Sequence, residues 1–91
     1  MVRTYGKAEY YEQRMLALKR LLEGEVADWQ LRNPGAQRKW LADELGISPG
    51  VLSHWLSPHK RDCIPPWLVG EFCMLVGSWT LLRWMDRRRS A

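Results

Sequence analysis

Apolar side chains recur at steps of three and four residues between residues 8 and 31. The positions with this spacing are Tyr11, Met15, Leu18, Leu22, Val26 and Trp29. Such a spacing places them along one face of a helix. The charged side chains fall largely elsewhere, as solvated positions do: Glu12, Arg14, Lys19, Arg20 and Glu23. Gly24 costs about 1 kcal/mol relative to alanine in a helix interior, so we expect the helix to bend or break there. The turn signal Asn33-Pro34-Gly35 ends it.

The next segment, residues 36–57, predicts two short helices. The first spans about Ala36 to Leu45, with an apolar stripe of Trp40, Leu41 and Leu45. Gly46 follows at a place where a helix end favours a left-handed residue. Ser48 is a good N-cap for the second helix, and Pro49 suits its first position. Its expected inward side consists of Val51, Leu52, Trp55 and Leu56, and Ser57-Pro58-His59 ends it.

Two more helices are predicted within residues 66–87. The first spans about Pro66 to Val76 and carries Leu68, Val69, Phe72, Leu75 and Val76. Gly77 terminates it, and Ser78 caps a last helix from about Trp79 to Arg87. On that helix Trp79, Leu82 and Met85 share one face, and Leu81 and Trp84 add a second apolar edge. No segment alternates like a half-buried strand, so we expect one all-α domain, residues 1–91, with about five helices and a long N-terminal one.

The stretch from Arg38 to Ser57 meets the physical demands of a helix-turn-helix, centred on Leu41 to Leu56. Two helices must pack closely across a turn of three or four residues. Ala42 is small enough for the crossing, and Gly46 is free to take a positive φ. Apolar groups close the crossing from below: Leu41, Leu45, Ile47, Leu52 and Trp55. All seven residues stand in the register found in phage and bacterial regulators.

In this motif the second helix lies in the major groove of DNA and contacts base edges with its N-terminal part. Its outward positions here are Ser48, Pro49, Gly50, Ser53, His54 and Ser57. Ser53 and His54 are the best candidates for base contacts, because serine pairs with several bases and a histidine N–H donates to a purine acceptor. Pro49 and Gly50 allow the helix N-terminus to approach a phosphate. A purely solvated His54 is the alternative.

Basic and polar residues flank the predicted reading helix on both sides in the sequence. Gln37, Arg38 and Lys39 begin the helix that crosses the DNA backbone, and Lys60 and Arg61 follow the reading helix. These five are candidate phosphate contacts, which position a protein without specifying sequence. The terminal run Arg87-Arg88-Arg89 is either a solvated end or a further phosphate contact.

The composition is compatible with this interpretation and limits the classes of partner that we expect. The net charge of +4 permits a polyanion partner. The chain of 91 residues buries only a modest core, and its six tryptophans suit an interface, so we expect a homodimer or higher oligomer. The apolar runs are too short for a secretory signal or a membrane span, which favours a cytoplasmic protein.

Catalytic and metal-binding patterns are missing from the sequence. It has no phosphate-cradling glycine loop, nucleophile elbow or His-Glu metal motif, and Asp43 and Glu44 are adjacent on a helix and point in different directions. The spacing of His54, His59, Cys63 and Cys73 fits no usual zinc pattern, and a cytosolic disulfide is not expected. We therefore expect no enzyme activity, no cofactor, no metal and no small-molecule substrate.

Three runs of residues carry a resemblance to phage CII-type transcriptional regulators, within the lambda-repressor-like DNA-binding superfamily. They are Leu41-Ala42-Asp43-Glu44-Leu45-Gly46-Ile47-Ser48, Leu52-Ser53-His54-Trp55 and Lys60-Arg61-Asp62-Cys63-Ile64-Pro65. The break at Gly77 before an apolar fifth helix is similar as well. The resemblance covers about Gln37 to Met85 and leaves the long N-terminal helix outside.

The resemblance implies a DNA-binding regulator of phage or prophage genes whose C-terminal helices self-associate. Two features depart from the pattern. Pro49-Gly50 replaces the usual polar pair at the start of the reading helix, and Leu56-Ser57-Pro58-His59 is inserted before the basic pair. The alternative is a protein–protein interaction module that keeps the helix-turn-helix fold without binding DNA, since fold alone does not settle function.

Overall fold

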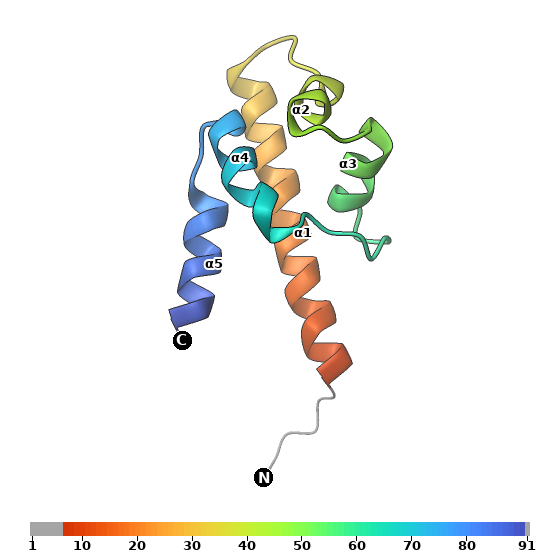
Figure 1. The fold of residues 1–91 in the computed structure, drawn as a ribbon, viewed down its shortest axis with the longest axis vertical. Coiled ribbons are helices and arrows are strands. Elements are labelled where there is room, and N and C mark those ends of the chain that lie inside the picture. The colour runs from red at the N-terminus through yellow and green to blue at the C-terminus, as the bar shows by residue number, and fades with distance from the viewer. Residues whose placement is uncertain (1–6, 91) are drawn as a thin grey trace.

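The computed structural model describes residues 7–90, and their side chains from Glu12 to Met85, as an all-α protein (Figure 1). Over this range the chain forms five helices and no strand, which confirms the expected fold class. Their bounds are α1 Lys7–Arg32, α2 Arg38–Leu45, α3 Pro49–Leu56, α4 Pro66–Val76 and α5 Thr80–Ser90. None of the helices in the described part of the chain combines the length and apolar character needed to cross a membrane.

Helix α1 runs along the length of the molecule, whose longest dimension is 52 Å, with α4 and α5 to one side of it and α2 and α3 to the other (Figure 1). The expected break at Gly24 is wrong, because the helix is continuous from Lys7 to Arg32. Gly24 is exposed, and Leu22 and Val26 on either side of it are fully buried. Packing on both sides of the glycine therefore outweighs its poor helix propensity. The helix ends where the backbone N–H and the side-chain amide of Asn33 both donate to the Trp29 carbonyl.

A single apolar core joins all five helices. Helix α3 packs on α1 and α2, and α4 packs on α1, α2 and α5. The buried apolar side chains are Leu22, Val26, Leu41, Ala42, Leu45, Leu52, Trp55, Leu56, Ile64, Val69, Phe72, Cys73, Val76 and Leu81. Every helix contributes to this set, so α3 is held by side chains from distant parts of the chain.

Several apolar residues expected on inward faces lie at the surface instead. Trp40 on α2 and Val51 on α3 are exposed. Each precedes a buried leucine, and one residue corresponds to about 100° of rotation around the helix axis. Leu82 on α5 is exposed, as is Trp79, which lies directly before this helix, whereas Leu81 is fully buried. The side chains of Tyr11 and of the run 87–89 lie outside the described residues.

Candidate nucleic-acid interface

The turn between α2 and α3 has the geometry required of a helix-turn-helix. Gly46 takes a φ of 74°, and its N–H donates to the Asp43 carbonyl at 3.1 Å. The Ile47 N–H donates to the Ala42 carbonyl at 3.0 Å, which completes a Schellman motif at the end of α2. Ala42 is fully buried, as a residue at a close helix crossing should be. The local expectations for the turn are therefore confirmed.

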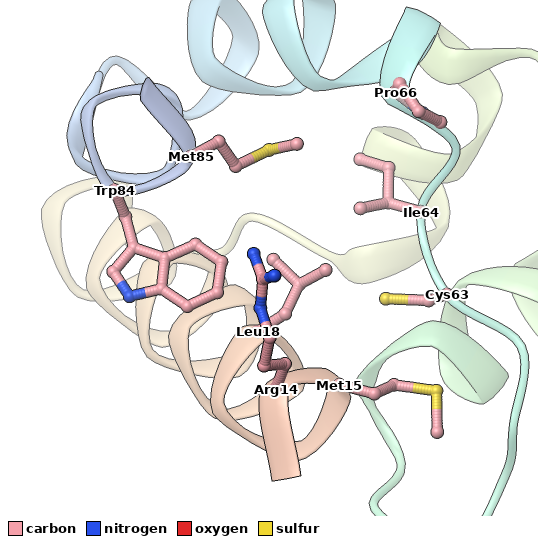
Figure 2. A pocket seen from close by; sticks show the side chains of 8 residues that line it. All are labelled: Arg14, Met15, Leu18, Cys63, Ile64, Pro66, Trp84 and Met85. Carbon is pink, nitrogen blue, oxygen red and sulfur yellow. The ribbon is translucent and has the colours of Figure 1, made fainter. Parts of the chain in front are cut away.

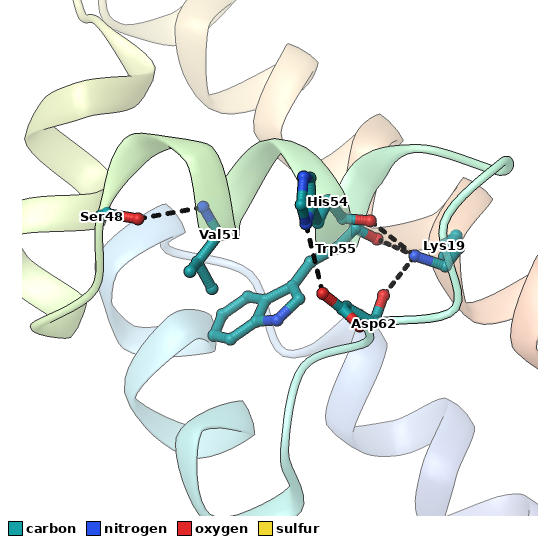
Figure 3. A network of polar contacts seen from close by, with 6 residues as sticks. All are labelled: Lys19, Ser48, Val51, His54, Trp55 and Asp62. Carbon is teal, nitrogen blue, oxygen red and sulfur yellow. Dashed lines mark hydrogen bonds and ion pairs between the residues drawn. The ribbon is translucent and has the colours of Figure 1, made fainter.

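Ser48 caps the N-terminus of α3 as its sequence position predicts. Its Oγ accepts a hydrogen bond from the Val51 N–H at 3.2 Å (Figure 3). Pro49, at the first helical position, has no N–H. Pro49 and Val51 therefore offer no free N–H to a phosphate. Of the first three helical residues, only Gly50 is left for the predicted anion contact at this helix end.

The candidate base-contacting residues lie on the outward side of α3. Helix α3 forms the edge of the molecule opposite α5 (Figure 1). Ser53 is exposed and the His54 side chain is 45% exposed, so neither is covered by the other helices. Leu52, Trp55 and Leu56 bury the opposite side of the same helix. The two turns of α3 therefore have one face buried in the core and an outer face with small polar side chains.

His54 does not stand alone on this outer face. Its Nδ1 lies 3.2 Å from a carboxylate oxygen of Asp62, which is itself 64% exposed. An ionised carboxylate only accepts hydrogen bonds, so in this pair Nδ1 carries the proton and donates. The other ring nitrogen, Nε2, points away from Asp62 (Figure 3). In the neutral ring Nε2 is then an acceptor, and it becomes a donor only when the ring is protonated.

A buried lysine of α1 binds the C-terminal end of α3. Lys19 is 1% exposed, and its ammonium donates to the carbonyls of His54 at 2.7 Å and Trp55 at 3.1 Å. It also donates to the carbonyl of Asp62 in the loop between α3 and α4 (Figure 3). The last carbonyls of a helix have no partner within the helix. Lys19 is a partner for the Trp55 carbonyl and a second partner for the His54 carbonyl, which also accepts from the Ser57 N–H at 3.3 Å. The expectation that Lys19 is a solvated residue is therefore wrong.

Burial lowers the pKa of the Lys19 ammonium, and electrostatic interactions with Cys63 and Asp62 oppose that shift. The sequence carried a signal for this burial. Lys19 is four residues after Met15 and three before Leu22, which is the spacing of the apolar face. A lysine on an apolar face needs buried acceptors, and their identity came only from the structure.

The candidate phosphate contacts are all exposed and fall into two groups. Gln37, Arg38 and Lys39 lie at the start of α2, where Gln37 is the N-cap but makes no side-chain capping bond. Lys60 and Arg61 lie in the loop after α3 and border a hollow of about 280 Å³. Glu12 of α1 borders the same hollow, so an acidic group stands near the second basic pair.

A separate apolar groove lies between α1, the start of α4 and α5 (Figure 2). Its volume is about 360 Å³, and it is lined mainly by Met15, Leu18, Cys63, Ile64, Trp84 and Met85. Arg14 is the one charged residue among the described side chains that line it. Cys63 and Cys73 are free thiols, and burial raises the pKa of both. No three His, Cys, Asp or Glu residues gather into a metal site between residues 12 and 85.

Ser57 ends α3 with its N–H donating to the Ser53 and His54 carbonyls, and it is partly buried. The structure thus places Ser53 and His54 on the outer face of α3, with Ser48 as its N-cap and with Asp62 and Lys19 beside its C-terminal end. No protein-family model matches the chain, and no curated protein or solved structure is similar enough to count as a match.

Proposed function

We propose that the chain is a sequence-specific DNA-binding transcriptional regulator of the phage or prophage type, which reads the major groove with α3. The observation that carries this proposal is the division of α3 into two faces. Leu52, Trp55 and Leu56 are buried, whereas Ser53 and His54 remain accessible. A short helix at the molecular edge, preceded by a tight turn, is the element that such motifs insert into DNA.

The geometry of His54 indicates which base edges it suits. With Nδ1 donating to Asp62, the neutral ring presents Nε2 as an acceptor. The major-groove donors available to it are the amino groups of adenine and cytosine. While the bond to Asp62 is kept, a contact to a guanine acceptor requires the protonated ring. Ser53 discriminates less, because a hydroxyl both donates and accepts.

The proposal is tested by selecting duplexes from a random pool with the purified full chain. We then compare the affinity for the selected duplex with that for a scrambled duplex at equal salt. Ser53→Ala/His54→Ala should lower this ratio about tenfold or more, since a good base contact contributes about 1–3 kcal/mol of discrimination. Weak general binding should persist and weaken as salt rises, because it depends on phosphate contacts.

His59→Ala is a suitable control, because His59 is also exposed but lies in the loop after α3. This variant also removes an imidazole ring, and it should leave the ratio of the affinities for the selected and the scrambled duplex unchanged. A double variant that discriminates duplexes as well as the wild type would refute the assignment of α3.

We further propose that the protein acts as a homodimer or larger homo-oligomer, because one short reading helix makes few contacts and two-fold symmetry doubles them. Trp79, directly before α5, and Leu82 on α5 are exposed and support self-association through the C-terminal helices. We expect symmetric half-sites in the selected duplexes. We also expect a mass in sedimentation of at least twice the 10.7 kDa of one chain.

An interaction module without DNA binding is the second candidate. The observation that favours it is the outer face of α4, where Trp67 and Met74 are 78% and 68% exposed. They stand seven residues apart and therefore share one face of the helix. Absence of binding to any duplex, even at low salt, would favour this candidate over the first.

A further inference from the structure

We propose that Lys19 is a positioning residue for sequence reading, which makes the N-terminal helix α1 part of the DNA-recognition apparatus. This inference rests on the proposed function of α3 as the reading helix. It goes beyond that function, because it gives α1 a part in recognition through the residues of α3 and of the following loop that Lys19 holds.

The Lys19 ammonium joins α1 to two segments that lie 35 to 43 residues later in the sequence. It extends from α1 and donates to the carbonyls of His54 and Trp55 in the last turn of α3. It also donates to the carbonyl of Asp62 in the following loop (Figure 3). The residue is 1% exposed, so its ammonium is largely shielded from water. A cation at a helix C-terminus is also favoured by the helix dipole.

Two of these acceptors belong to the pair that orients the candidate reading side chain. The backbone of His54 and the backbone of Asp62 both bind Lys19, and their side chains bind each other at 3.2 Å. Lys19 therefore sets the distance between the two backbones from which the imidazole and the carboxylate extend. Without it, the core still holds α3, but the Asp62 backbone loses its bond to Lys19 and the direction of Nε2 is less closely constrained.

The core alone does not supply this control. Leu52 and Trp55 bury the inner face of α3 and keep the helix on the body of the protein. Apolar contacts are not directional, whereas hydrogen bonds from a single ammonium to three carbonyls are. The expected consequence of losing Lys19 is thus a loss of discrimination between duplexes, beyond any loss of stability.

The decisive comparison is between Lys19→Met and Arg20→Met in the full-length chain. Both remove one positive charge and leave the same side chain, but Arg20 is exposed on the neighbouring position of α1. Affinities for the selected and the scrambled duplex are measured by fluorescence anisotropy well below each variant's melting temperature. We expect Lys19→Met to lower the ratio of the two affinities at least tenfold. Arg20→Met should weaken both affinities equally and leave the ratio unchanged.

Backbone amide NMR spectra without DNA provide a second readout. The amides of residues 53–57 should shift in Lys19→Met and stay in place in Arg20→Met. A folded Lys19→Met variant with unshifted amides, or with an undiminished affinity ratio, overturns the positioning role. If the wild type itself discriminates no duplexes, the proposed function fails, whereas the amide shifts still decide whether Lys19 orients α3.

If Lys19→Met does not fold, Lys19→Arg takes its place. It keeps the charge, but its planar guanidinium cannot direct one nitrogen at three carbonyls. A lowered affinity ratio supports the positioning role, and an unchanged ratio overturns it.

Discussion

Replacing Gly46 and Gly24 by alanine, one at a time, should change stability in opposite directions. The chemical change is the same, and a methyl group added at either position would meet no heavy atom of a packing neighbour within 4 Å. Steric clash therefore contributes to neither variant. What differs is the backbone, because Gly46 has a φ of 74° in the turn before α3, whereas Gly24 lies inside α1.

The magnitudes follow from these conformations. A left-handed conformation costs an L-residue about 1–2 kcal/mol, and the lower entropy of the unfolded alanine chain returns about 0.4–1 kcal/mol. Gly46→Ala should therefore destabilise the protein by about 1 kcal/mol. Gly24→Ala should stabilise it by about 1 kcal/mol, the difference in helix propensity. For a domain of this size, 1 kcal/mol corresponds to a Tm change of about 4–8 °C.

Thermal melts followed by circular dichroism at 222 nm, a standard helix signal, compare the two variants with the wild type. We expect Tm values on either side of the wild-type value, roughly 10 °C apart in total. Shifts in the same direction would refute the reasoning, because they would mean that the backbone conformation of Gly46 or the helical continuity through Gly24 is not as described.

Three other changes test the local packing and chemistry. Ser48→Ala removes the bond to the Val51 N–H and should cost about 1 kcal/mol in urea unfolding. Leu52→Ala should lower the free energy of unfolding by about 2–5 kcal/mol, since this side chain is fully buried. Val51 is next to it and exposed, so Val51→Ala should lower it far less. Equal losses would contradict the assigned faces of α3. Because burial raises the pKa of Cys63 and Cys73, less thiolate forms at pH 8 and both should react more slowly with iodoacetamide than free cysteine. Cys73, which is fully buried, should be the slower of the two, and denaturant should remove the difference.

The helix-turn-helix was predictable because its determinants are local. A glycine at a helix end, a serine before a proline and a small residue at the crossing each act within a few positions of the chain. The structure places Gly46, Ser48 and Ala42 in these roles. The break expected at Gly24 failed for the opposite reason, since the contacts that keep α1 continuous come from other helices.

The contacts that support α3 could not be predicted from spacing. Lys19 and its acceptors are separated by 35 to 43 residues, and no local pattern relates them. The same is true of Arg32, whose guanidinium donates to the Val76 carbonyl at 2.8 Å across 44 residues. Hydrophobic periodicity identifies which face of α1 is inward, but it does not say which helix ends meet that face.

These two contacts give α1 a common role toward its neighbours. Lys19 binds carbonyls in the last turn of α3, and Arg32 binds a carbonyl in the last residue of α4. In both cases a cation of α1 meets the negative end of a helix dipole. The helix that lies outside the family resemblance thus fixes the ends of two helices inside it. Exposed residues of α3 such as Ser53 can then be exchanged with little effect on stability, because the position of the helix depends on its buried face and on α1.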